Sequence, residues 1–246
     1  MALRGNVSKT DCTEPVQGFI DARVPELLQA GLDGYVFKAR SPSCGLAVEV
    51  VNEAHPFPGL FAGALIEACP DLPVVEEGAL ARREEREAFL ERVFAHARLR
   101  GLFGSAWTLA DLMRFHAREK MLLLSHDRVG YDRLGRCVAE SGTRPAREVA
   151  VAYTLEFVRV LAKPTSVGQH VNVLQHMLGH FRSHLDRARL TALHDEIAAY
   201  RRGEMALHDI HARIRARAQQ LDIHWVCEQS ILAPFPQDLL TEEIHD

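Results

Sequence analysis

The chain has 246 residues, of which 47% are hydrophobic and 25% are charged, and its formal net charge is −4. This composition is typical of folded globular proteins, and the length is sufficient for one or two domains with a substantial core. The net negative charge excludes a chain that is basic throughout, so any contact with nucleic acid has to come from a local basic surface.

Neither a membrane span nor a secretory signal is expected. No apolar run approaches the roughly 20 residues that cross a bilayer, and the first residues lack the apolar core of a signal peptide. The five cysteines are odd in number and never spaced as CxxC, which favours reduced thiols over a disulfide framework. We therefore expect a cytoplasmic protein that does not contact a membrane.

The first part of the chain, to about residue 104, mixes helices with short strands. Thr13 can begin a helix that Gly31 ends, with Pro25 kinking or dividing it. The predicted strands are 33–38, 48–51 and 72–78, and the further predicted helices are 59–69 and 82–103. Helices that alternate with short strands indicate an α/β domain.

From Trp107 onward the pattern is almost entirely helical. The predicted helices begin at Thr108 or Asp111, near Tyr131, and at residues 145–163 and 166–185, with two more before the C-terminal tail. The fold class we predict is α+β and multidomain, with a partial α/β domain over 1–104 followed by an all-α helical domain over 105–246.

One cysteine stands in a constrained turn, within the sequence "FKARSPSCGL" at 37–46. Exposed backbone amides and the positive charges of Lys38 and Arg40 favour the thiolate of Cys44. A thiolate is a nucleophile and a soft ligand for iron or zinc. An incidental loop cysteine is the alternative, and spacing alone does not separate the two.

Longer strings resemble known families. "DGYVFKARSPSCG", with "GLFAGALIEACPDLPVVEEGAL" after it, resembles the C-terminal half of TudS-type thiouracil desulfidase domains. "HAREKMLLLSHDRVGYDRLGRCVA" and "KPTSVGQHVNVLQHMLGHF" are similar to the YbgA-type helical domain. The two in this order resemble RudS-type desulfidases, which remove sulfur from 4-thiouridine in tRNA.

The resemblance implies a chemistry for the turn. In that family three cysteines hold a 4Fe-4S cluster, and an open iron takes the sulfur of the substrate thiocarbonyl. Cys44 would be the third cluster ligand, and Ser41 and Ser43 would donate hydrogen bonds to a cluster sulfide or to the base. The partner implied is tRNA.

The sequence departs from that pattern at the other ligands. The family takes its first two cluster cysteines from an N-terminal stretch that is absent here, and Cys12, Cys69, Cys137 and Cys227 match no cluster motif. We expect either a fragment of a longer protein or a shortened homologue that has lost the chemistry. The alternative function is a non-catalytic RNA-binding or interaction protein that keeps the helical domain.

The helical part offers candidate RNA contacts. "KPTSVGQH" at 163–170 gathers donors around a helix N-terminus, which favours either a phosphate or a routine capped turn with Ser166 as N-cap. Late arginines favour a solvated helical face or an RNA-backbone footprint. The residues we expect to contact RNA are Lys163, Thr165, His170, Asn172, Gln175, His176 and Arg182.

Histidines are numerous, and three of them, His176, His180 and His184, recur at every fourth position. The helix predicted over 166–185 carries all three, so we expect them to form a ladder on one side of it. An i,i+4 pair of histidines can chelate zinc, but no third ligand accompanies them. Zinc binding is therefore the weaker interpretation beside hydrogen-bonding or surface histidines.

Overall fold

The structure, a computed structural model, describes residues 11–49 and 55–240. The chain divides into two compact units, Met1–Ala97 and Arg98–Asp246. The division lies within helix α3 (Arg83–Phe103), whereas the sequence prediction put the boundary after this helix, at residue 104. None of the helices in the described ranges combines the length and the apolar character needed to cross a bilayer.

The N-terminal unit contains a small parallel sheet and the helices that cover it. Its elements are α1 (Thr13–Gln29), β1 (Tyr35–Phe37), α2 (Leu60–Ala68), β2 (Val74–Glu76), the 3-10 helix η1 (Glu77–Ala81) and the first part of α3. The register of β1 and β2 pairs Tyr35 with Val74 and Phe37 with Glu76. The strand expected over 48–51 lies partly outside the described residues, and Val48 forms only an isolated antiparallel bridge with Phe57.

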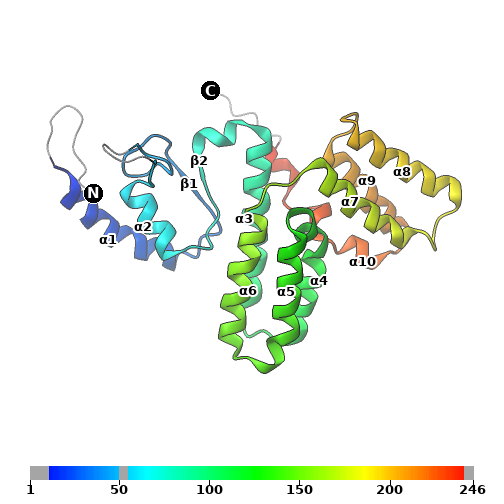
Figure 1. Ribbon diagram of the computed structural model, residues 1–246, viewed down its shortest axis with the longest axis horizontal. Coiled ribbons are helices and arrows are strands. Elements are labelled where there is room, and N and C mark those ends of the chain that lie inside the picture. Colours follow the sequence, from blue (N-terminus) through cyan, green and yellow to red (C-terminus); the bar gives the residue numbers. More distant parts are fainter. Residues whose placement is uncertain (1–10, 50–54, 241–246) are drawn as a thin grey trace. The chain divides into compact units, whose positions relative to one another are not determined.

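The core of this unit follows from the apolar stripe of α1. Ile20, Val24 and Leu27 recur at helical spacing, are buried, and pack in one cluster with Phe37 and Phe61. Figure 1 shows α1 and α2 side by side. The helix continues through Pro25 without division. The mixture of short strands and helices predicted here is confirmed.

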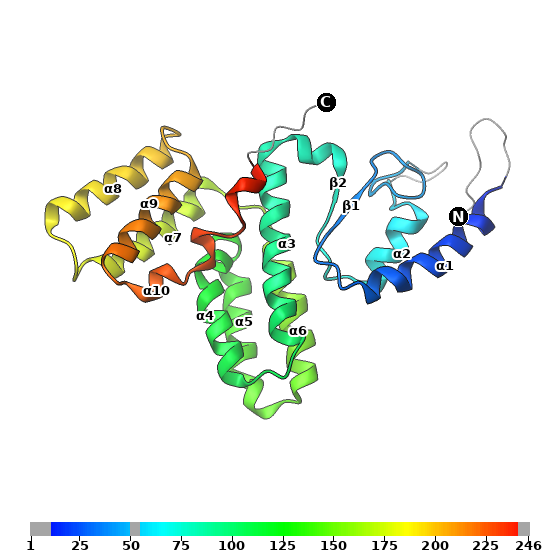
Figure 2. The same cartoon turned by 180° about the vertical axis from the view of Figure 1, so that it is seen from behind.

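In the described residues of the second unit, all regular secondary structure is helical. Its elements are α4 (Leu109–His126), α5 (Arg128–Glu140), α6 (Ala146–Leu161), α7 (Val167–Leu178), α8 (Arg187–Arg201), α9 (Leu207–Gln220) and the short α10 (His224–Cys227), with 3-10 turns η2 (Ser141–Thr143), η3 (Gly179–Phe181), η4 (Ser230–Leu232) and η5 (Gln237–Leu240). In Figure 1, α4, α5 and α6 lie side by side, and Figure 2 shows α7, α8 and α9 as a second group. Helix α4 also packs on α7, so the two groups share it.

Local chemistry explains where the helices begin. Thr108 is the N-cap of α4, and its side chain accepts from the Asp111 amide while the Asp111 carboxylate accepts from the Thr108 amide. Both candidates named from the sequence thus serve one capping box. Ser166 is the N-cap of α7, which was one of the two alternatives left open by the sequence.

The expectation of one helix over 166–185 was wrong. Helix α7 ends at Leu178, the chain continues as the 3-10 turn η3, and Asp186 then caps α8. Gly179, a weak helix former, stands at the break. His184 follows the turn and pairs with Ser183, so the ladder of three histidines on one helix does not form.

Candidate functional site

The turn after β1 links two hydroxyl groups to a thiol. Ser41 Oγ lies 3.2 Å from Ser43 Oγ, and Ser43 Oγ lies 3.4 Å from Cys44 Sγ. Ser41 Oγ also accepts from the Cys44 amide at 3.2 Å. The three side chains are half-buried. Arg40, whose φ is 56°, turns the chain away from the strand into this arrangement.

The turn is fixed to the start of α2. The Ser43 carbonyl accepts from the amides of Phe61 at 2.9 Å and Ala62 at 3.2 Å, so these two amides are not available to an anion. Gly59 is required for the approach, because a Cβ there would lie 2.5 Å from the Ser43 carbonyl oxygen. The positions of Ser43 and Cys44 are therefore set by the backbone.

Two carboxylates at the end of β2 hold the turn from the other side. Glu76 Oε1 accepts from the Leu46 amide at 2.8 Å, and Glu77 accepts from the Ala39 amide. Sequence reasoning did not assign these acids. Their signal is the pair "EE" at the carboxyl end of a strand, since β1 and β2 are parallel and their carboxyl ends meet at one edge.

The described residues do not fit a cluster of the family type. Among them, no group of three His, Cys, Asp or Glu side chains could hold a metal ion. Cys69 is a poor thiolate: burial and the neighbouring carboxylate of Asp71 raise its pKa to about 11, and its thiol donates to Asp71 at 3.4 Å. Cys44 thus supplies one thiol where three are needed.

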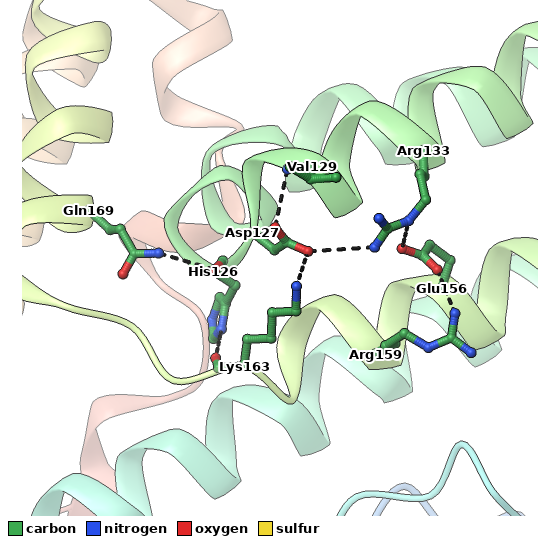
Figure 3. A network of polar contacts seen from close by, with 8 residues as sticks. All are labelled: His126, Asp127, Val129, Arg133, Glu156, Arg159, Lys163 and Gln169. Atoms are coloured by element: carbon green, nitrogen blue, oxygen red, sulfur yellow. Dashed lines mark hydrogen bonds and ion pairs between the residues drawn. The ribbon is translucent and has the colours of Figure 1, made fainter.

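Lys163, expected at an RNA surface, is engaged within the helical unit. Its ammonium pairs with Asp127, which also lies 3.6 Å from Arg133. Arg133 in turn pairs with Glu156 at 2.6 Å, and Arg159 completes the network at 2.9 Å from the same carboxylate (Figure 3). The Lys163 ammonium, above all, holds the pKa of Asp127 below its ordinary value. This lysine is thus exposed but already paired within a charge network on the surface of the helical unit.

The turn that enters α7 is held by hydrogen bonds within itself and to His126 of α4. The Ser166 hydroxyl accepts from the Gln169 amide at 3.3 Å, and the Gln169 side chain donates to the His126 carbonyl at 3.1 Å. The His126 ring donates to the Lys163 carbonyl at 2.6 Å (Figure 3). These bonds support the capped-turn interpretation of 163–170.

The other expected RNA contacts divide between two environments. His170 shares a 2.8 Å hydrogen bond with the Tyr200 hydroxyl, and Thr165 is half-buried. Exposed positions are those of Asn172, Gln175, His176 and Arg182. The structure therefore brings Asn172, Gln175 and His176 together on the solvent side of α7, in a different unit from Cys44.

Comparison with known proteins identifies the helical region. A family described as "Protein of unknown function (DUF1722)" matches residues 120–236. The "Uncharacterized protein YbgA" of Escherichia coli (strain K12) is 30% identical over 152 residues, which cover 61% of this chain and 90% of that protein. The chain belongs to the DUF1722 family. No solved structure matches it.

A second group of side chains in the DUF1722 region brings His176, an expected RNA contact, and His180 together with Lys120 and Trp225, and sequence reasoning did not predict this grouping. The ring of His180 stacks on Trp225, with centroids 4.2 Å apart and 22° between the planes. The Lys120 ammonium lies 5.8 Å from the centroid of the Trp225 ring, and the His176 ring lies 6.2 Å from that of His180. Sequence spacing carries no signal for this group, because its members come from α4, α7, η3 and α10.

Proposed function

We propose that this DUF1722 protein takes part in removing sulfur from 4-thiouridine in tRNA. The helical unit binds the RNA, and the turn of Ser41, Ser43 and Cys44 meets the thiolated base. The observation that carries this is the chain of hydrogen-bond distances from Ser41 Oγ through Ser43 Oγ to Cys44 Sγ. The resemblance of the turn and the helical region to RudS-type desulfidases supports the same function.

The residues of the turn have distinct roles in this proposal. Cys44 offers a soft sulfur ligand, and the hydroxyls of Ser41 and Ser43 can donate hydrogen bonds to a developing sulfur anion. A 4Fe-4S cluster would supply a thiophilic iron, but it needs three thiolates, and the described residues gather no such set. Cys44 would be one of the three thiolates, and the other two would have to come from outside the turn of Ser41, Ser43 and Cys44.

A non-catalytic RNA-binding role is the second candidate. It is favoured by the extent of the family match, which covers residues 120–236 and leaves the turn of Ser41, Ser43 and Cys44 outside. In this case the helical unit would bind tRNA, and Cys44 would be an ordinary half-buried thiol.

One experiment separates the two functions. The full chain, treated anaerobically with ferrous iron and sulfide and then desalted, is mixed with tRNA that contains 4-thiouridine. Sulfide release and the loss of near-ultraviolet absorbance by 4-thiouridine report desulfuration, and a gel shift reports binding. Cys44→Ser is compared with Cys227→Ser, which removes a half-buried thiol from the helical unit.

Desulfuration that requires Cys44 and not Cys227 would support the desulfidase role. Binding of tRNA without sulfide release by any of the proteins would reject the desulfidase role and support the RNA-binding one. Neither binding nor release would contradict both.

A further inference from the structure

A group of positive and aromatic side chains gathers on the helical unit, on elements that are distant in sequence. We propose that Lys120, Arg128, His176, His180 and Trp225 form a binding site for an unpaired RNA segment. The cations hold a phosphate, and the stacked rings hold a neighbouring base. This site rests on the RNA-binding function proposed above and gives it a location.

The charges of this group lack compensation. None of the ion pairs found within the described ranges includes Lys120, while Arg128 has one weak partner, Asp132, at 3.6 Å. Both histidines are exposed, and partial loss of water contact lowers their pKa values first. The charges of Lys120, His180 and Arg128 lower the pKa of His176 further, and that of Lys120 lowers the pKa of His180. Positive groups close enough to oppose one another's protonation are all stabilised by one bound anion.

The rings of His180 and Trp225 offer a stacking surface for a base, which a phosphate site alone does not have. His180 is exposed and lies flat against the indole of Trp225, at a centroid distance of 4.2 Å. Aromatic side chains next to basic ones are typical of grooves for single-stranded nucleic acid, because bases of any sequence can extend such a stack. An acidic peptide would use the cations and leave the rings without a role, so RNA fits the group better.

All five side chains lie within the region that defines the DUF1722 family, residues 120–236. They are carried by α4, α5, α7, η3 and α10 of the one helical unit. The site therefore depends on packing inside this unit alone. It can be tested in the full chain without reference to Cys44.

The test uses the small number of tryptophans. The protein has two, so Trp107→Phe leaves Trp225 as its one indole fluorophore. We expect a short single-stranded oligoadenylate to quench the fluorescence of Trp225 in this background. Lys120→Gln is expected to weaken binding about tenfold and to lower the slope of log affinity against log salt by about one.

Two matched variants define the controls. Lys120→Arg keeps the charge beside the Trp225 ring and is expected to bind within about twofold of the parent, so a tenfold loss in Lys120→Gln reports the charge rather than any change of side chain at this position. Arg147→Gln removes one positive charge from an exposed position of α6, away from the group, and is also expected to change binding less than about twofold.

Three outcomes would overturn the site. If Lys120→Gln binds RNA as tightly as Arg147→Gln while the parent still shifts tRNA, this location is wrong and the RNA-binding function stands. If base-free polyphosphate quenches Trp225 as strongly at equal phosphate concentration, the group is a general anion site. If the parent binds no RNA, the site and the proposed function both fall.

Discussion

At the scale of single residues, His96 shows how a buried group can carry charge in the N-terminal unit. Its Nδ1 lies 2.9 Å from a carboxylate oxygen of Asp33, and its Nε2 lies 3.5 Å from one of Asp71. Burial by itself lowers the pKa of this histidine, but the hydrogen bonds and charges of Asp71 and Asp33 outweigh burial and raise it. The hydrogen bond to His96 likewise lowers the pKa of Asp71.

These two shifts predict a pH window for stability. The His96 contribution is fully present below its unfolded pKa, about 6.5, and is lost as pH rises through the raised folded value. The Asp71 contribution is present above its unfolded value and is lost as pH falls through the lowered folded value. We therefore expect wild type to exceed His96→Gln in stability most at weakly acidic pH.

Hydrogen exchange of peptides from β1 and β2 measures this difference, at pH values on both sides of about 6.5. His55→Gln removes an exposed histidine of the same unit and serves as the control. A protection difference between wild type and His96→Gln that grows as pH rises would contradict the charged form of His96.

The residue scale also shows what local sequence can predict. Thr108 and Ser166 could be named among the candidate caps because a cap depends on neighbours three residues away. Lys163 was assigned to RNA, and its nearest anion, Asp127, is 36 residues earlier in the chain. No local pattern marks a partner at that distance. The grouping of Ser41, Ser43 and Cys44 could be expected from the sequence, because the three residues are near neighbours in one turn.

At the scale of elements, α5 and α6 approach each other closely at Gly130. A Cβ at this position would lie 2.3 Å from Val160 Cγ2 and 2.7 Å from Asp127 Oδ2. Gly130 is buried, so the contact is part of the helix interface rather than of the surface. The absence of a side chain at this point lets the two helices pack at their observed separation.

Gly130→Ala is expected to destabilise the protein, although alanine is the better helix former. Overpacking costs about 1–3 kcal/mol, whereas alanine gains about 1 kcal/mol over glycine within a helix. Gly135→Ala, in the same helix, is the matched control, because its Cβ would lie 3.9 Å from the nearest atom, His116 Nε2. Urea unfolding should show a loss for the first variant and a gain of about 0.5–1 kcal/mol for the second. Equal effects would contradict the close approach.

Element boundaries were predictable where one amphipathic stripe coincided with one helix. The helix expected over 82–103 is α3, and that over 145–163 is α6. The prediction failed over 166–185, where the apolar residues continue through a 3-10 turn. Periodicity reports which residues are buried, and Leu178 and Phe181 are buried on both sides of the break, so the pattern did not reveal it.

At the scale of the whole molecule, a buried charged pair ties distant segments of the helical unit together. The Arg98 guanidinium donates to both carboxylate oxygens of Glu119, at 2.8 and 2.9 Å, and to the Pro234 carbonyl at 2.9 Å. The Ser230 hydroxyl also donates to Glu119 at 2.6 Å. Glu119 is fully buried, so these donors are what compensates its charge.

The pair of Arg98 and Glu119 bears on where the boundary of the helical unit lies. Arg98 is the first residue of the second unit, yet it lies within α3, and its partner Pro234 is 136 residues away. The sequence of α3 is one amphipathic pattern from end to end, and this pattern does not show which unit each residue contacts. The first visible change in sequence pattern therefore comes after the helix. The predicted limit at residue 104 would therefore separate Arg98 from Glu119.

We expect a fragment of residues 83–246 to be substantially more stable than a fragment of residues 105–246. Removing Arg98 leaves the Glu119 carboxylate buried without its main donors, which costs about 3–5 kcal/mol. Urea unfolding followed by circular dichroism measures the difference in stability between the two fragments.

In the full chain, Arg98→Met should cause a comparable loss of stability. Adding Glu119→Leu should restore most of it, because no unpaired charge then stays buried. Arg202→Met, which breaks the exposed pair with Glu204, should leave stability unchanged within error. Equal stability of the two fragments would show that Arg98 is dispensable and that the helical unit begins after α3.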